Sequence, residues 1–136
     1  MKRLAAIFLI GILPILSAAE ITLAENGQAK AGIVIPEKAK PIVQMAAREL
    51  AAHLKQMTGA DFAIVTASEY KGGPRLAIGF QKGLPEVLSS ERFPNLSPEE
   101  LVIDSSGDTI LLAGGRPRGA LYATYEFLES LGMSTE

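Results

Sequence analysis

The stretch ELVIDSSGDTILLAGGRPRGALYATYEFLESLG runs from Glu100 to Gly132 and holds a hairpin pattern followed directly by a helix pattern. Strand-forming residues at 101–103 and at 109–112 lie on either side of Ser105–Asp108, a segment rich in turn-forming residues. This arrangement predicts two antiparallel strands joined by a tight turn.

The helix predicted after the hairpin is amphipathic and is expected to end at Gly132. Its apolar face is formed by residues three or four positions apart, namely Leu121, Thr124 or Tyr125, Leu128 and Leu131.

The segment GGRPRG, residues 114–119, joins the hairpin to this helix, and two interpretations of it are open. Backbone N–H groups at a helix N-terminus can bind an anion, and two nearby arginines would help. However, the segment has neither the dinucleotide-binding spacing nor the lysine of a phosphate-binding loop. We favour a structural interpretation, in which Gly114 and Gly115 allow a sharp strand-to-helix turn. Arg118 would form a hydrogen bond across this turn or point into a neighbouring domain.

A second amphipathic helix is predicted over KPIVQMAARELAAHLKQMTG, residues 40–59. Pro41 suits the first helical turn, and Gly59 suits the left-handed position that follows a helix. The predicted apolar face contains Val43, Ala46, Ala47, Leu50, Leu54 and Met57.

The remaining segments predict strands and one long loop. Two short strands, with Ile21 and Leu23 in one and Ile33–Ile35 in the other, are expected around the turn Asn26-Gly27. Further strands are predicted at 61–67 and 75–80, and residues 81–99 are expected to form a surface loop with one helical turn near Glu86–Leu88. Because two amphipathic helices need one surface to cover, the predicted fold is α/β (α+β), a mixed sheet with both helices on one face.

The first nineteen residues have the pattern of a cleavable signal peptide. A positive start at Lys2 and Arg3 precedes an apolar run, and small residues stand before Glu20. We therefore expect an exported, secreted or periplasmic bacterial protein whose mature chain begins at Glu20, with no membrane contact after cleavage. The chain has no cysteine, so neither disulfides nor a lipid-modified cysteine is expected. Its formal net charge is −2, and no basic run survives cleavage, which argues against nucleic acid as a partner.

No group of residues in the sequence predicts catalysis, a metal site or a cofactor. Glu126 and Glu129 lie one helical turn apart, but a solvated helix face explains them better than a pair of catalytic acids. The acids at 99, 100, 104 and 108 flank strands and turns, where acids are common. His53 is the only histidine, and a catalytic triad or a metal site would need companions.

Aromatic residues give little support for a sugar-binding surface. The chain has no tryptophan. Tyr122 and Tyr125 are on the last predicted helix and are expected to be packed, whereas Tyr70 and Phe93 are expected in exposed turns or loops.

The order of these motifs resembles a known family. GIVIP, AARELAAHLKQMTGADFAIV, RLAIG and the stretch from Glu100 to Gly132 resemble the domain that precedes the catalytic barrel in family 67 α-glucuronidases. The pattern is also similar to the second domain of family 20 β-N-acetylhexosaminidases. The resemblance covers residues 21–132 and implies a mixed sheet with two helices on one face. It also implies a supporting role, because the catalytic acids of such secreted glycoside hydrolases lie on the (β/α)₈ barrel that follows.

No catalytic residue of the family maps onto this sequence. The resemblance carries over Arg118 and Gly119 as the residue pair ahead of the last helix. The residues expected to have structural or interface roles are Gly114, Gly115, Arg118, Gly119 and Tyr122.

These observations give one favoured organisation and two alternatives. Residues 1–19 are expected to be the signal peptide, 20–133 the accessory domain, and 134–136 the truncated entry to a missing barrel. The expected partner is a catalytic (β/α)₈ barrel, normally in the same chain, and an oligosaccharide is a further candidate. The first alternative is a free-standing periplasmic carbohydrate-binding or protein-interaction domain, and the second is a small hydrolase that uses Glu126 and Glu129.

Overall fold

The computed structural model describes residues 2–4 and 21–132 of the chain. The elements in chain order are β1 (Lys2–Leu4), β2 (Ala24–Glu25), β3 (Gln28–Ala29), β4 (Gly32–Ile35), α1 (Pro41–Thr58), β5 (Ile64–Thr66), β6 (Arg75–Ile78), the 3-10 turns η1 (Glu86–Leu88) and η2 (Ser90–Arg92), β7 (Leu101–Ser106), β8 (Thr109–Gly114) and α2 (Pro117–Ser130).

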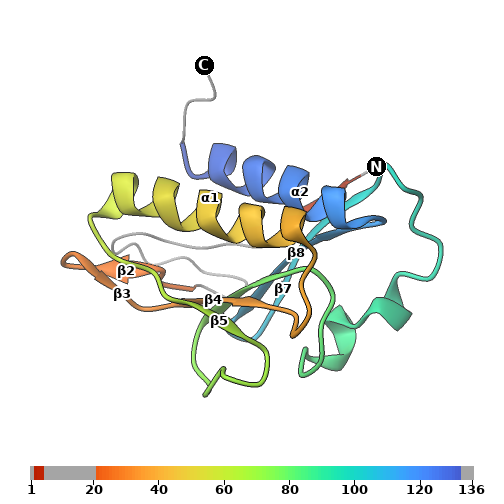
Figure 1. Cartoon of the computed structure of the whole chain (residues 1–136), viewed down its shortest axis with the longest axis horizontal. Coiled ribbons are helices and arrows are strands. Elements are labelled where there is room, and N and C mark those ends of the chain that lie inside the picture. Colours follow the sequence, from red (N-terminus) through yellow and green to blue (C-terminus); the bar gives the residue numbers. More distant parts are fainter. Residues whose placement is uncertain (1, 5–20, 133–136) are drawn as a thin grey trace, which may run out of the picture.

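The main sheet is mixed and has the strand order β1-β7-β8-β6-β4-β5, while β2 and β3 form a separate small hairpin. Strands β8, β6, β4 and β5 are parallel to one another, and β7 pairs with β8 in the antiparallel sense. Helices α1 and α2 lie side by side on one face of the sheet (Figure 1). The predicted mixed sheet with both helices on one face is therefore confirmed.

The larger core lies between the helices and the sheet. The buried side of α1 consists of Val43, Ala46, Ala47, Leu50 and Leu54, as predicted, with Met57 packed at the margin. Gly59 follows the helix with a φ of 80°, in the left-handed region, and its N–H donates to the carbonyl of Lys55. On α2 the largest fully buried side chain is Phe127, which the predicted apolar face omitted. Leu121, Thr124 and Leu128 are buried as expected.

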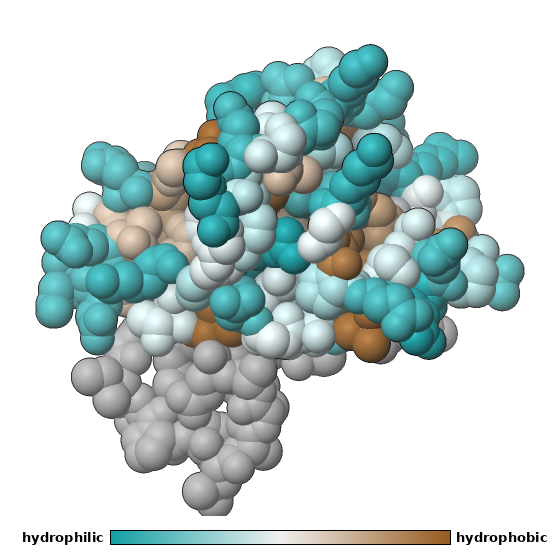
Figure 2. Space-filling model, turned by 90° about the horizontal axis from the view of Figure 1, so that it is seen from below, coloured by the Kyte–Doolittle hydropathy of each residue, from teal (hydrophilic) through white to brown (hydrophobic). Residues whose placement is uncertain are grey.

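A smaller core lies on the opposite face of the sheet, beneath β6, β7 and β8. Leu88 of η1 is buried there against Ala77, Val102, Leu111 and Ala113. Partly buried apolar residues of the connection between β6 and β7 complete it, namely Phe80, Leu84, Phe93 and Leu96. The helical turn at Glu86–Leu88 is confirmed, but this connection is a packed cover and not simply a surface loop. From this side the surface is mostly polar, with small separate hydrophobic areas (Figure 2).

A buried arginine fastens this side of the sheet. Arg75 is 6% exposed, and its guanidinium donates to Thr109 Oγ1 and to the carbonyl of Gly83, both at 2.8 Å. The ring of Tyr70 lies 4.5 Å from the guanidinium carbon, and its hydroxyl donates to the carbonyl of Gly73. Burial is the main cause that raises the pKa of Tyr70. Arg75 thus links the β5–β6 connection, through Tyr70, and the β6–β7 connection, through Gly83, to strand β8.

Two predicted turns differ in detail from the structure. The turn Asn26-Gly27 is present, with both residues at positive φ, but it joins β2 to β3 and leaves β4 to pair with β5 and β6. The turn between β7 and β8 is only Gly107-Asp108, because Ser105 and Ser106 extend β7. Gly107 has a φ of 60°, which suits the first position of a tight hairpin turn.

The predicted signal peptide lies outside the described residues except for Lys2–Leu4, whose backbone pairs with β7 in the parallel sense. Among the residues that the structure describes, no helix is both long and apolar enough to cross a membrane.

Candidate functional site

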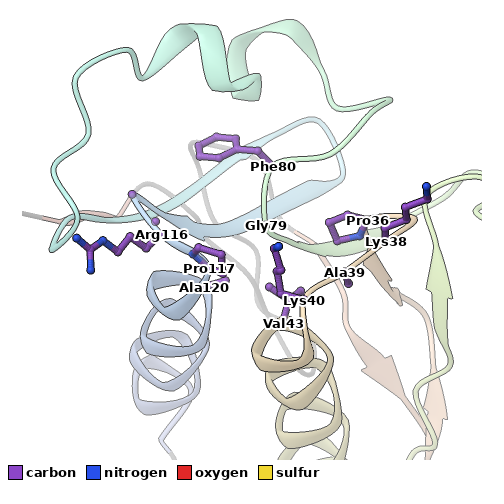
Figure 3. Close-up of a pocket in the computed structure, with 12 residues that line it drawn as sticks. Pro36, Lys38, Ala39, Lys40, Val43, Gly79, Phe80, Arg116, Pro117 and Ala120 are labelled. Atoms are coloured by element: carbon purple, nitrogen blue, oxygen red, sulfur yellow. The ribbon is translucent and has the colours of Figure 1, made fainter.

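The site begins where the parallel strands end. The carboxyl ends of β4, β6 and β8 meet at one edge of the sheet, and α1 and α2 both start at that edge. In open parallel sheets, ligands bind in the crevice outside these strand ends. A pocket of about 240 Å³ lies there, between the first turns of the two helices (Figure 3). Its lining is Pro36, Lys38, Ala39, Lys40, Val43, Gly79, Phe80, Gly114, Gly115, Arg116, Pro117 and Ala120.

The pocket is electropositive. Lys40 lies between the two helix ends, and Lys38 and Arg116 lie at its opposite ends (Figure 3). The N-terminus of a helix carries a partial positive charge, and neither α1 nor α2 has an acidic residue in its first turn or a side-chain cap. Among residues 2–4 and 21–132, no acidic residue lines this pocket. This arrangement can attract a carboxylate or another small anion.

A second hollow continues the first along the same edge. It has a volume of about 670 Å³ and shares Pro36 and Lys38 with the first pocket. The only acid that the described part of the chain contributes to it is Glu37, whose carboxylate accepts hydrogen bonds from the backbone N–H and the hydroxyl of Ser68. Lys82 adds another cation. We call the two hollows together the strand-end groove.

The glycines of the predicted loop form one wall of this groove and hold α2 against β8. A Cβ built on Gly114 would lie 2.6 Å from the Cα of Gly119 and 3.0 Å from the carbonyl oxygen of Glu100. A Cβ on Gly115 would lie 1.9 Å from the carbonyl oxygen of Ser97. Gly114, Gly115 and Gly119 all have a negative or extended φ, outside the left-handed region. The structure therefore needs them for close backbone approach, whereas the sequence suggested conformational freedom at a sharp turn.

Arg118 and Tyr122 are exposed residues of α2. Arg118 is exposed, and its guanidinium has no hydrogen-bond or ion-pair partner among the described residues. Tyr122 is 49% exposed, so the expectation that it is packed was wrong. Tyr125 is half-buried, and its hydroxyl donates to Glu49 Oε1 at 3.0 Å. That hydrogen bond to a carboxylate is the main cause that raises the pKa of Tyr125.

None of the acids considered in the sequence analysis lines the strand-end groove, and two of them accept hydrogen bonds from nearby backbone N–H groups. Glu126 is half-buried and Glu129 is exposed. Glu100 Oε1 accepts the N–H of Ser97, and Asp104 Oδ1 accepts the N–H of Ser105.

His53 lies on α1 with its side chain 29% exposed and its Nε2 atom 3.6 Å from Glu49 Oε1, which agrees with the expected surface histidine. Within residues 2–4 and 21–132, no group of three potential ligands could hold a metal ion.

Sequence reasoning did not find the groove residues Lys38, Lys40 and Phe80. Each lies within five residues after the end of a buried strand, and this position is the feature of the sequence that could have indicated a site. The signal has meaning only when the strands are known to be parallel, because only then do their carboxyl ends share one edge.

The fold and the groove define a small α/β domain with a hollowed, cationic strand-end edge. The family model described as "Glycosyl hydrolase family 67 N-terminus" matches residues 17–127. The chain therefore belongs to this family of glycosyl hydrolase N-terminal domains. No curated protein matches the chain at a significant level.

Two solved structures have the same fold at low sequence identity. One is a GH138 enzyme targeting pectin rhamnogalacturonan II, with a TM-score of 0.50 and 13% identity over 78% of this chain. The other is CpGH84D, with a TM-score of 0.51 and 13% identity over 79% of this chain. The matched region is 10% of the first protein and 19% of the second.

Proposed function

We propose that this domain supports the catalytic part of a carbohydrate-degrading glycoside hydrolase and does not take part in the chemistry itself. The observation that carries the proposal is the family match over residues 17–127 to the N-terminus of such enzymes. The site geometry supports it, because Glu100 and Asp104 accept hydrogen bonds from the backbone N–H groups of Ser97 and Ser105 and do not line the strand-end groove. The partner is then a catalytic domain in the same polypeptide.

The proposal is tested by assaying the purified chain and by reading the gene beyond the codon for Glu136. We expect no turnover of aryl glycosides above a buffer blank, and a reading frame that continues into a catalytic domain. Turnover that is lost in Glu126→Gln or Glu129→Gln would instead establish the small-hydrolase alternative. A stop codon directly after Glu136 would contradict a supporting role within one polypeptide.

Export is a separate part of the proposal and rests on the pattern of residues 1–19. Expressed in a bacterial host, the protein is expected in the periplasmic fraction or the medium with Glu20 as its first residue. N-terminal sequencing checks this. Retention of Met1 in a cytoplasmic product would contradict it.

The strand-end groove favours one second function, which is weak binding of an acidic carbohydrate. Of the residues that the structure describes, four with cationic side chains line the groove, and the one acid, Glu37, accepts hydrogen bonds from Ser68. Titration calorimetry with glucuronic acid should then give heat that neutral xylo-oligosaccharides do not give and that Lys40→Ala abolishes. If none of these sugars gave heat, carbohydrate binding by the groove would be rejected and only the supporting role would remain.

A further inference from the structure

The larger of the two hollows in the strand-end groove lies where the chain leaves two neighbouring strands on opposite faces of the sheet. Strand β4 leads into α1, which packs on one face. Strand β6 leads into residues 80–96, which cover the second core on the other face. Because β4 and β6 are adjacent and parallel, this divergence leaves a crevice at their carboxyl ends. In open α/β sheets a crevice of this kind is the usual ligand site.

Gln81 lies across the ends of both strands and lines the larger hollow. Its Nε2 atom donates to the carbonyl of Val34 on β4 at 3.2 Å, and to the carbonyls of Ile78 and Gly79 at the end of β6 at 3.3 and 3.1 Å. Its Oε1 atom is buried and accepts no hydrogen bond from any described residue. A buried acceptor without a donor is destabilising, so Gln81 gains from a ligand that brings one. Because Gln81 already lines the hollow, rotation about its side-chain bonds brings Oε1 to such a ligand.

The rest of the lining suits the two kinds of surface that a sugar ring presents, which are apolar C–H groups and hydroxyl donors. Pro36 and Ala67 supply apolar surface. Each carboxylate oxygen of Glu37 accepts one hydrogen bond from Ser68, which leaves further lone pairs for ligand hydroxyls. The larger hollow therefore offers acceptors and apolar contact to a ring that donates hydrogen bonds.

The volumes of the two hollows divide the groove into parts with different roles. Pockets that hold small organic ligands usually have volumes of about 300–1,000 Å³. The larger hollow, at about 670 Å³, lies within this range, whereas the smaller pocket, at about 240 Å³, lies below it. Lys40 and Arg116 line the smaller pocket, and Lys38 belongs to both hollows. One ligand can thus place a ring in the larger hollow and an anionic group in the smaller pocket.

We propose that the larger hollow is a subsite for a neutral sugar ring whose neighbouring unit carries a carboxylate bound in the smaller pocket, and that Gln81 selects the ring. This rests on the proposed binding of an acidic carbohydrate by the groove, and it names the ligand as an acidic disaccharide or a longer chain that ends in one. A ring hydroxyl donates to Gln81 Oε1, and the carboxylate faces Lys40. An acidic monosaccharide fills only one of the two parts and binds more weakly.

Titration calorimetry of the whole chain with three matched ligands tests this division. Lactobionate joins a galactose ring to a gluconate unit, gluconate is the carboxylate-bearing unit alone, and lactose is the corresponding neutral disaccharide. We expect lactobionate to bind about tenfold more tightly than gluconate, because its ring contacts the apolar lining and donates to the buried acceptor of Gln81. We expect no measurable heat from lactose, because it has no charge to attract the lysines.

Two variants of the lining assign the tighter binding to the larger hollow. Ala67→Leu enlarges a lining side chain and should weaken lactobionate about tenfold, to the affinity of gluconate. Its matched control is Ala63→Leu, because Ala63 is exposed just before β5 and lines neither hollow. Gln81→Met removes the acceptor and should abolish the advantage of lactobionate while leaving gluconate binding unchanged. Circular dichroism of each variant checks that the domain is folded.

Each other outcome overturns a defined part of the reasoning. Equal affinities for lactobionate and gluconate in the wild type would reject the ring subsite and leave the binding of small acids intact. Wild-type affinity for lactobionate in folded Ala67→Leu or Gln81→Met would also reject it. Equal heat from lactose and lactobionate would reject the role of the carboxylate. No heat from any of the three would reject carbohydrate binding by the whole groove, whereas the supporting role is tested separately by the glycosidase assay and the gene sequence.

Discussion

Replacement of Gly114 by alanine should strongly destabilise the domain. The size of the loss in the free energy of unfolding follows from the contact between β8 and α2. The added Cβ would lie 2.6 Å from the Cα of Gly119 and 3.0 Å from the carbonyl oxygen of Glu100. Carbon atoms in packed interiors prefer separations of about 3.5–4.0 Å, so the first turn of α2 must move by about 1 Å. Both contacts are backbone atoms, which no side-chain rotation can relieve. Overpacking of this kind costs about 1–3 kcal/mol.

Gly32 provides the matched control for this substitution. It begins β4, its φ is not positive, and a Cβ added there would meet nothing within 4 Å. Gly32→Ala should therefore change the free energy of unfolding by less than about 0.5 kcal/mol, or raise it slightly, because alanine restricts the unfolded chain. Guanidinium denaturation followed by circular dichroism gives both values. For a domain of this size, about 2 kcal/mol at Gly114 corresponds to a fall in Tm of about 10 °C. If Gly114→Ala unfolded at the same denaturant concentration as Gly32→Ala, the close-approach argument would be wrong.

Three further predictions concern the core and the polar contacts. Phe127→Ala should cost about 3–5 kcal/mol in urea unfolding because it empties a fully buried aromatic site, and a loss below about 1 kcal/mol would contradict its place in the core. Arg75→Met should cost about 2 kcal/mol, since the carbonyl of Gly83 and the hydroxyl of Thr109 lose a charged donor, and unfolding curves that match the wild type would refute this role. Tyr125→Phe should lower stability near neutral pH, and the difference from the wild type should shrink as the pH rises above about 10. The sign follows because the pKa of Tyr125 is raised in the folded state, so its stabilising effect is present below the unfolded pKa of about 10 and is lost above it. Absorbance titration in the ultraviolet band of tyrosinate checks this, and the variant should lack a component that titrates above the ordinary tyrosine range.

The local sequence pattern predicted the helices, the hairpin between β7 and β8 and the general fold. A buried helix face repeats every three or four residues, so the face of α1 can be recognised without knowledge of the rest of the chain. Gly59 was identifiable for the same reason, because its left-handed conformation depends on the end of its own helix. The family resemblance depended on such local segments, and the family match bears it out.

The features of the candidate site depended on contacts between segments far apart in the chain. The strand-end groove exists because β4, β6 and β8 are parallel and neighbouring, which no single segment encodes. The order in which strands pair follows from the competition of all strands for partners, and periodicity within one strand carries no information about it.

The sequence by itself determined the two helices, the β7–β8 hairpin, the apolar face of α1 and the family of this protein, because each is written in residues a few positions apart. Only the tertiary structure decided that Gly114 and Gly119 are needed for close packing, that residues 80–96 cover a second core, and that Tyr122 is exposed. Each of these depends on how near another part of the chain comes. Burial and contact are properties of pairs of segments, and the packing of the whole domain decides which pairs meet.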